Sequence, residues 1–230
     1  MMKKVGILGG MGPEATLLLM ERIMKNTHAT EDQEHVPLLV DNNTQVPSRI
    51  NAIIKKKGPD PLPVLCGMAT SLEKSGAKAL AMPCNTAHAF IDEIRSKITI
   101  PFISIVDETI EYLKKIRVQK KRIGILASPA VEIAKIFEYE LEKNDMNFLY
   151  VGDDELRLSL IEAIKANDKT LSNSVEQLSS QIEGQKPDFL LIACSEFSII
   201  SGLIRDKFSI PVIDTLDLLV EKIIKFSTCD

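Results

Sequence analysis

Hydrophobic residues follow two alternating patterns along the chain. Short runs of aliphatic and β-branched residues are separated by longer segments in which apolar positions recur at helical spacing. This alternation predicts parallel sheets built from strand–helix–strand units. The predicted strands are residues 4–8, 38–42, 79–82, 102–106, 122–126, 147–151, 189–193 and 212–214. The predicted helices are residues 13–27, 48–57, 63–75, 87–96, 107–116, 131–144, 155–166, 171–183, 196–207 and 216–226.

The chain also contains an internal repeat. Cys84 and Cys194 each end an apolar run, and they lie 110 residues apart. The same offset relates Arg95 to Arg205, Lys97 to Lys207, Ile100-Pro101 to Ile210-Pro211, Ile103 to Ile213 and Asp107 to Asp217. Such a repeat predicts an α/β fold of two similar parallel-sheet domains, related by internal duplication, with a cleft between them.

The repeat also predicts where the domains divide. Residues 101–116 lead into the second opening strand, and the segment after residue 210 is the counterpart of the segment after residue 101. We therefore expect a first domain of residues 1–100 plus 210–230, which carries Cys84, and a second domain of residues 101–209, which carries Cys194. The first domain is then discontinuous, and the last helix is expected to pack back on it.

Composition narrows the classes of partner. The net charge of −4 leaves no basic footprint for nucleic acid. The first apolar run, residues 5–8, is too short for a signal-peptide core or a membrane span, so we expect a cytoplasmic protein without a membrane partner. In that compartment four cysteines are expected to be thiols rather than disulfides. No spacing of His, Cys, Asp or Glu suggests a metal site.

Cys84 and Cys194 each follow a buried strand and precede a helical pattern. Each sulfur is therefore expected at the carboxyl edge of a parallel sheet, where open α/β sheets bind ligands. A helix N-terminus there stabilises a thiolate relative to the reference pKa of about 8.5, so we expect at least one thiolate near neutral pH. Thiols on both sides of a cleft suit proton transfer between the two faces of a carbon. The alternative is two small apolar residues that end core strands.

Three motifs carry a resemblance to a known family. They are Gly-Ile-Leu-Gly-Gly-Met-Gly-Pro-Glu-Ala-Thr at 6–16, Pro-Cys-Asn-Thr-Ala-His at 83–88 and Ala-Cys-Ser-Glu at 193–196. The chain resembles the cofactor-independent aspartate/glutamate racemases, and the first two motifs resemble the aspartate racemase branch. The resemblance implies two similar α/β domains with the active site between them, an amino acid as the small-molecule substrate, and a homodimer. It also implies inversion at Cα without pyridoxal phosphate or metal, with Cys84 and Cys194 as the catalytic pair.

The remaining candidates surround these cysteines. Met11 and Gly12 lie in a glycine-rich turn whose amides we expect near a substrate carboxylate, at a helix begun by Pro13; a turn without a ligand is the alternative. Asn85 and Thr86 are expected donors beside the first cysteine, or an ordinary helix cap. Ser195 and Glu196 flank the second cysteine, where Glu196 tunes the thiol, binds the substrate ammonium, or only complements a helix N-terminus.

Recognition of a substrate side chain is assigned to a polar run. Asn43 and Gln45 precede Ser48, which is expected to cap a helix that presents Arg49. An arginine there suits a bidentate contact with a second carboxylate. In the family that the chain resembles, a loop of this kind holds the acidic side chain and a lysine assists, which gives Lys165 here. Either cation could instead be a solvated helix charge.

One turn departs from the family pattern. The family has Ala-Thr-x-Gly-Thr and a later tyrosine, whereas this chain has Ala-Ser-Pro-Ala-Val at 127–131 and then Phe137. Ser128 keeps one hydroxyl, but donors for an α-carboxylate are lost. Three functions therefore stay open: an aspartate racemase, a broad-specificity racemase or related cysteine-dependent isomerase, and an inactive relative that binds an amino acid or a partner.

Overall fold

A computed structural model describes residues 2–118, 120–168 and 171–229, and within them the chain forms two four-stranded sheets. Every strand pair is parallel. The orders are β2-β1-β3-β4 and β6-β5-β7-β8, the same topology twice, which confirms the predicted fold class and agrees with the sequence repeat. The strands are β1 (Val5–Gly9), β2 (Leu38–Asn42), β3 (Ala79–Ala81), β4 (Phe102–Ile103), β5 (Arg122–Leu126), β6 (Asn147–Tyr150), β7 (Phe189–Ile192) and β8 (Val212–Asp214).

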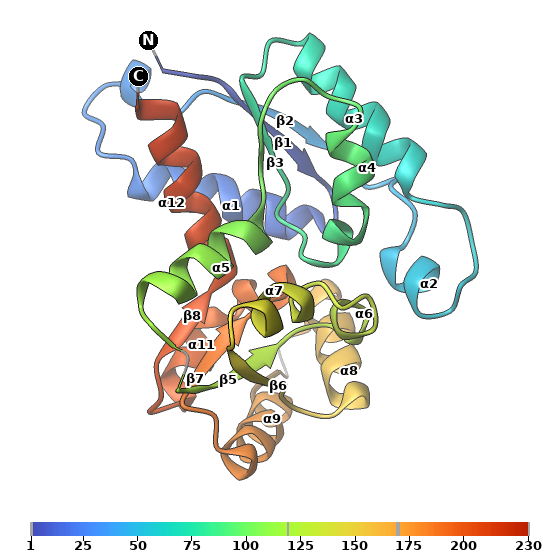
Figure 1. The fold of residues 1–230 in the computed structure, drawn as a ribbon, viewed down its shortest axis with the longest axis vertical. Coiled ribbons are helices and arrows are strands. Elements are labelled where there is room, and N and C mark those ends of the chain that lie inside the picture. Colours follow the sequence, from blue (N-terminus) through green and yellow to red (C-terminus); the bar gives the residue numbers. More distant parts are fainter. Residues whose placement is uncertain (1, 119, 169–170, 230) are drawn as a thin grey trace.

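Helices flank both sheets, and α5 and α12 lie where the two lobes meet (Figure 1). Both chain ends lie together at the far end of α12, where the amide of Lys3 donates to the carbonyl of Ser227 (3.0 Å). The α-helices are α1 (Pro13–Asn26), α2 (Arg49–Ile53), α3 (Leu62–Lys74), α4 (Ile91–Arg95), α5 (Ile105–Lys115), α6 (Pro129–Ile133), α7 (Glu138–Lys143), α8 (Asp154–Lys165), α9 (Leu171–Gln185), α10 (Ser195–Ile199), α11 (Ser201–Lys207) and α12 (Thr215–Thr228). Two 3₁₀ helices, η1 (Asp32–Glu34) and η2 (Thr86–Phe90), complete the described elements.

Several predicted elements have different ends in the structure. The predicted strand 102–106 stops at Ile103, because the side chain of Ser104 accepts from the amide of Asp107 (3.1 Å) and begins α5. The predicted helix 131–144 is two helices, interrupted where Lys135 adopts a φ of 52°. The predicted helix 196–207 is likewise divided into α10 and α11.

The core continues from one sheet into the other. Alternate side chains of a strand point to opposite faces, so Ile7 of β1 and Ile125 of β5 enter one shared cluster with side chains of α5 and α12. On its other face the first sheet contributes Leu80 to a cluster with α3 and α4. The second sheet contributes Leu190 to a cluster with α8 and α9. The two halves therefore share one apolar layer.

Two short strands pair across the predicted domain limits. The strand Phe102–Ile103 pairs with β3 and lies in the first sheet, although it was assigned to the second domain. The strand Val212–Asp214 pairs with β7 and lies in the second sheet, although it was assigned to the first. The fourth strand of each unit pairs directly with its third, so each sheet is completed before the chain leaves it. A division of the chain into two domains stays a prediction.

His88 is a polar residue buried in the first lobe, four residues after Cys84. Its Nδ1 atom lies 2.9 Å from the Cys84 carbonyl oxygen, and its ring meets Phe102 edge to face. A carbonyl only accepts, so Nδ1 carries the proton, and Nε2 has no partner among the described residues. Burial lowers the pKa of His88 to about 4. This imidazole is therefore neutral in the folded protein.

We predict that His88 makes stability depend on pH. Its folded pKa lies below the ordinary value of 6.5, so in the window between them the unfolded chain binds more protons and stability falls as pH falls. From about pH 7.5 to about pH 4.5 the parent should lose about 2 kcal/mol of unfolding free energy more than His88→Gln. Urea unfolding at both pH values measures this difference, and an identical loss in parent and variant would contradict it.

Candidate active site

The strand order explains why four loops meet. In each sheet the chain crosses from one side to the other between the first and third strands, which opens a crevice at their carboxyl ends. The loops after β1 and β3 carry Met11 and Cys84, and those after β5 and β7 carry Ser128 and Cys194. All four side chains line one cavity, so the crevices of the two halves face each other.

The cavity has a volume of about 40 Å³. Its walls come from both halves of the chain and from α2 and α8. The lining residues are Met11, Ser48, Arg49, Ile50, Cys84, Thr86, Ser128, Ile161, Lys165, Cys194 and Glu196. Eight of these were predicted site residues, and the structure brings them together from segments more than 180 residues apart in the chain.

Cys194 has a carboxylate beside its thiol. Its Sγ donates to Oε2 of Glu196 at 3.1 Å, and the other carboxylate oxygen lies 3.2 Å from Nζ of Lys165. Burial and then the negative charge of Glu196 raise the pKa of the Cys194 thiol well above its ordinary value. Cys194 is therefore protonated at neutral pH.

Cys84 lies near positive charges instead. Burial also raises the pKa of this thiol, but the charges of Arg49 and Lys165 act in the opposite direction. Burial thus works against the predicted thiolate at both cysteines, because loss of water outweighs the local dipole. Of the two, Cys84 is the thiol that nearby cations help to ionise.

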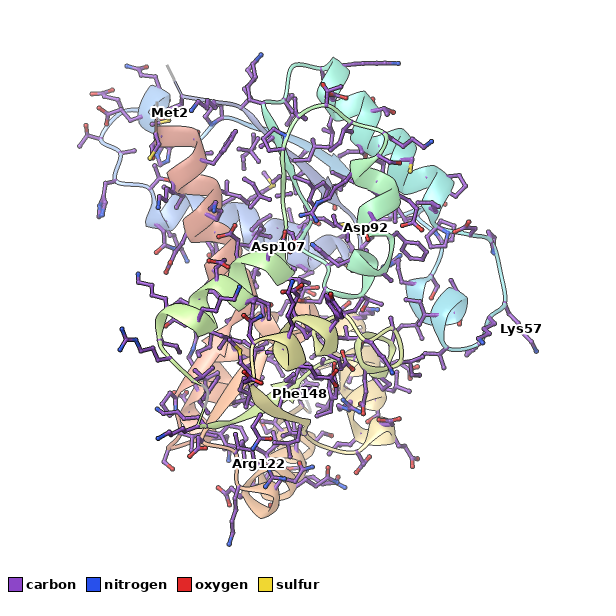
Figure 2. The ribbon with its side chains drawn as sticks, viewed as in Figure 1. Met2, Lys57, Asp92, Asp107, Arg122 and Phe148 are labelled. Atoms are coloured by element: carbon purple, nitrogen blue, oxygen red, sulfur yellow. The ribbon has the colours of Figure 1, made fainter. Side chains whose placement is uncertain are left out.

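Arg49 lies on α2, which projects to one side of the molecule (Figure 1), and the side chain of Lys57 on the loop that follows points outward (Figure 2). Ser48 caps this helix as predicted, accepting from the amide of Asn51. Nη1 of Arg49 donates to the carbonyls of Val46 (3.2 Å) and Pro47 (3.0 Å). In the part of the chain that the structure describes, no carboxylate pairs with this guanidinium. Arg49 therefore brings an uncompensated positive charge to the cavity.

Two hydroxyls join the halves at the cavity wall. Oγ1 of Thr86 and Oγ of Ser128 lie 3.2 Å apart, and both side chains are buried. Ser128 sits in the turn that departs from the family pattern. Arg157, itself 2% exposed, holds this turn by donating to the Ala127 carbonyl and to Glu132. Phe137, in place of the family's tyrosine, lies fully buried in the core.

Five predicted residues do not line the cavity. Asn43 uses Oδ1 to accept from the amide of Gln45 (2.9 Å), and the Gln45 side chain is exposed, so their polarity serves a turn. Asn85 is buried and donates to Thr215, while Ser195 places its hydroxyl 3.5 Å from Glu196. Gly12 caps α1 behind Met11, and a Cβ there would lie 3.8 Å from Glu196.

Ser48, Ile50 and Ile161 were not predicted to line the site. Ile161 precedes Lys165 by four residues on α8 and so shares its face, a signal that the helical spacing contains. Ser48 and Ile50 flank Arg49, but only the path of α2 decides that they reach the cavity.

Within residues 2–118, 120–168 and 171–229, no three His, Cys, Asp or Glu side chains gather closely enough to bind a metal ion. Nor does any helix there have the length and apolar character needed to cross a membrane.

Known proteins share both the sequence and the fold of this chain. A broad-specificity amino-acid racemase from Bacillus subtilis (strain 168) is 26% identical over 217 residues, covering 92% of each chain. An aspartate racemase from Picrophilus torridus has a TM-score of 0.85 at 30% identity, covering 98% of this chain and 94% of its own. An aspartate racemase homologue from Pyrococcus horikoshii OT3 has a TM-score of 0.76 at 21% identity, covering 99% of this chain and 100% of its own, which shows the fold.

The model of the family described as Asp/Glu/Hydantoin racemase matches residues 8–223. That span includes both cysteines and every residue that lines the cavity. The chain belongs to the Asp/Glu/hydantoin racemase family.

Proposed function

We propose that this protein is a cofactor-independent aspartate racemase in which Cys84 and Cys194 transfer protons at Cα. The observation that carries the proposal is that both buried thiols, at equivalent positions of a duplicated unit, line one cavity. One thiolate removes the Cα proton from one face, and the opposite thiol returns a proton to the other face. The return step inverts the centre and leaves the two cysteines with exchanged protonation states.

The charges near the two thiols differ in a way that suits proton transfer between them and the substrate. Glu196 favours the protonated form of Cys194, and Arg49 and Lys165 favour the ionised form of Cys84. We assign the starting state to a Cys84 thiolate and a Cys194 thiol, with the two titrations coupled. The carbanionic intermediate needs donors at the substrate carboxylate, and Thr86 and Ser128 are the hydroxyls that line the cavity.

Charge supports an acidic substrate. Glu196 compensates Lys165, and Arg49 remains as an unpaired cation, so the charged lining residues sum to one positive charge. Aspartate carries one net negative charge and a second carboxylate that matches the planar fork of arginine. The 30% identity to the aspartate racemase of Picrophilus torridus supports the same substrate.

The cavity is small, with a volume of about 40 Å³. The wall formed by α2 is the one best suited to move, because this short helix has no buried residue. We propose that α2 moves outward to admit the substrate and carries Arg49 back onto its side chain.

A broad-specificity racemase is the second candidate. The relative from Bacillus subtilis is named for that activity and matches 92% of this chain. The turn after β5 also supports it, because Pro129 and Ala130 offer no side-chain donor where the family turn has glycine and threonine. Turnover of aspartate alone favours the first candidate, and comparable turnover of neutral amino acids favours the second.

The cysteine pair is tested by hydrogen exchange at Cα in deuterated water. The parent should place deuterium at Cα of aspartate while optical rotation is lost. Cys84→Ser and Cys194→Ser should each stop racemisation, because one face then lacks a base of suitable strength. Each should still exchange only the enantiomer that faces the remaining thiol, as measured by mass spectrometry and chiral chromatography. Normal racemisation by either variant would refute the two-thiol mechanism.

Glu196 should control the reactivity of one thiol more than the other. Its charge raises the pKa of Cys194, so Glu196→Gln should lower that pKa and increase the thiolate fraction at a given pH. At about pH 8 we expect alkylation of Cys194 by iodoacetamide to accelerate about tenfold, with a smaller change at Cys84. Peptide mass spectrometry gives both rates, and exposed Cys229 is the internal control. Unchanged alkylation at Cys194 would remove Glu196 from this role.

Arg49 tests the acidic substrate. Arg49→Ala should remove a bidentate contact worth roughly 2 to 5 kcal/mol, a loss of about thirtyfold or more in kcat/KM for aspartate. Turnover of a neutral amino acid should fall much less, only through the lost charge that favours the Cys84 thiolate, and Arg49→Lys should restore aspartate turnover only in part. Equal losses on acidic and neutral substrates would assign Arg49 to the α-carboxylate or to the fold.

A further inference from the structure

Arg22 of α1 lies outside the cavity and joins the two halves of the chain. Its side chain is 13% exposed. Nη1 donates to the carboxylates of Asp214 (2.7 Å) and Asp217 (2.8 Å), and Nη2 donates to the Ser198 carbonyl (2.8 Å) and the Ser201 hydroxyl (3.0 Å). All four acceptors belong to α10, α11, β8 and α12. One guanidinium thus holds four elements that follow Cys194 in the chain.

Asp214 extends this network. Its carboxylate is fully buried, and the oxygen that does not bind Arg22 accepts from the Ser198 hydroxyl (2.7 Å) and from the amide of Leu216 (3.0 Å). Burial raises the pKa of Asp214, and the charge of Arg22 opposes this rise. Ser198 is therefore held through its carbonyl by Arg22 and through its hydroxyl by Asp214.

The contacts of Arg22 and Asp214 with Ser198 hold α10, the helix that Cys194 precedes. Cys194 is the N-cap of α10, which carries Glu196 in its first turn and Ser198 in its last. A five-residue helix has little stability of its own, so contacts with its neighbours decide its position. The Ser198 hydroxyl also lies 3.5 Å from the Cys194 carbonyl. Movement at Ser198 would accordingly shift both the thiol and the carboxylate beside it.

The first half lacks the ionic network. At the offset of 110 residues, His88 occupies the position equivalent to Ser198, and Ser104 occupies the position equivalent to Asp214. His88 meets the Cys84 carbonyl as a neutral ring, and Ser104 caps α5 without charge. The pairs Arg95–Asp107 (2.6 Å) and Arg205–Asp217 (2.9 Å) do repeat. The two halves thus share this arginine–aspartate pair, whereas the contacts of Arg22 reach only the half that carries Cys194.

We propose that Arg22, through its ion pair with Asp214, is a positioning residue for Cys194: it fixes α10 against α1 and so sets the place of Cys194 and Glu196 at the cavity. The proposal rests on the function assigned above for its effect on proton transfer. Its effect on the geometry of α10 does not depend on that function.

The variant Arg22→Lys tests it. Lysine keeps a positive charge near buried Asp214, but it cannot serve all four acceptors at once. We expect α10 to loosen, so that iodoacetamide alkylates Cys194 about fivefold faster while Cys84 changes less than about twofold. The matched control is Arg205→Lys, which alters the exposed partner of the same Asp217 and should change neither rate.

Exchange at Cα gives the second readout. The equilibrium constant of racemisation is one, so kcat/KM is equal in both directions and cannot separate the two faces. Deuterium exchange into each enantiomer can. Arg22→Lys should slow exchange of the enantiomer that Cys194→Ser fails to exchange by about tenfold, and should leave exchange of its mirror image within about twofold.

The outcomes separate the two proposals. If the parent exchanges no amino acid, the proposed function fails, and alkylation still decides the role of Arg22. If Arg22→Lys slows exchange of both enantiomers equally, the positioning role is overturned. It is also overturned if iodoacetamide alkylates the two thiols of the variant at equally raised rates, or neither thiol faster than in the parent. Should Arg22→Lys not fold, Asp214→Asn keeps the shape and the acceptor for Ser198, and is judged by the same two ratios.

Discussion

The loss of water around ionisable groups where the two sheets meet is the constraint on which the rest of this structure depends. Away from water a charge is costly unless a partner lies close by. Cys84, Cys194 and Asp214 are all buried there, and burial is the largest influence on the pKa of each. What each group does is then decided by the charge beside it: Arg49 for Cys84, Glu196 for Cys194 and Arg22 for Asp214.

Duplication gives this arrangement its symmetry, and side-chain substitution removes it where the chemistry needs a difference. The strand orders are the same in both halves, so each cysteine lies just after the equivalent strand of its sheet. In the proposed mechanism one thiol donates a proton and the other accepts one, so the two cannot be equivalent at the start of a turnover. The cations near Cys84 and the carboxylate that accepts from Cys194 supply that difference without changing the backbone frame.

The site is assembled from elements of unequal rigidity. The cysteines follow central strands, and Lys165 ends a helix with several buried residues. Arg49 instead lies on a short helix without a buried residue. Rigid placement suits the role proposed for the two thiols, because small displacements there would slow proton transfer steeply. The movement proposed for α2 would let Arg49 close over a substrate side chain.

Much of this could be predicted from the amino-acid sequence alone. The short aliphatic runs that alternate with helical segments, together with the repeat offset, predict two parallel sheets and the two equivalent cysteines. The capping of α2 by Ser48 is local in the same way. Each of these follows from neighbours within a few residues or from a constant offset.

Other features were decided only by the tertiary structure. Burial raises the pKa of both thiols, and that burial depends on how both lobes close over them. Asn43 and Gln45 stabilise a turn instead of lining the cavity. The strands β4 and β8 join sheets that the predicted boundaries did not assign to them. The contacts of Arg22 with Ser198 and Asp214 join residues more than 170 positions apart. No pattern along the chain encodes such pairs, because desolvation and long-range contacts exist only once the whole chain has packed.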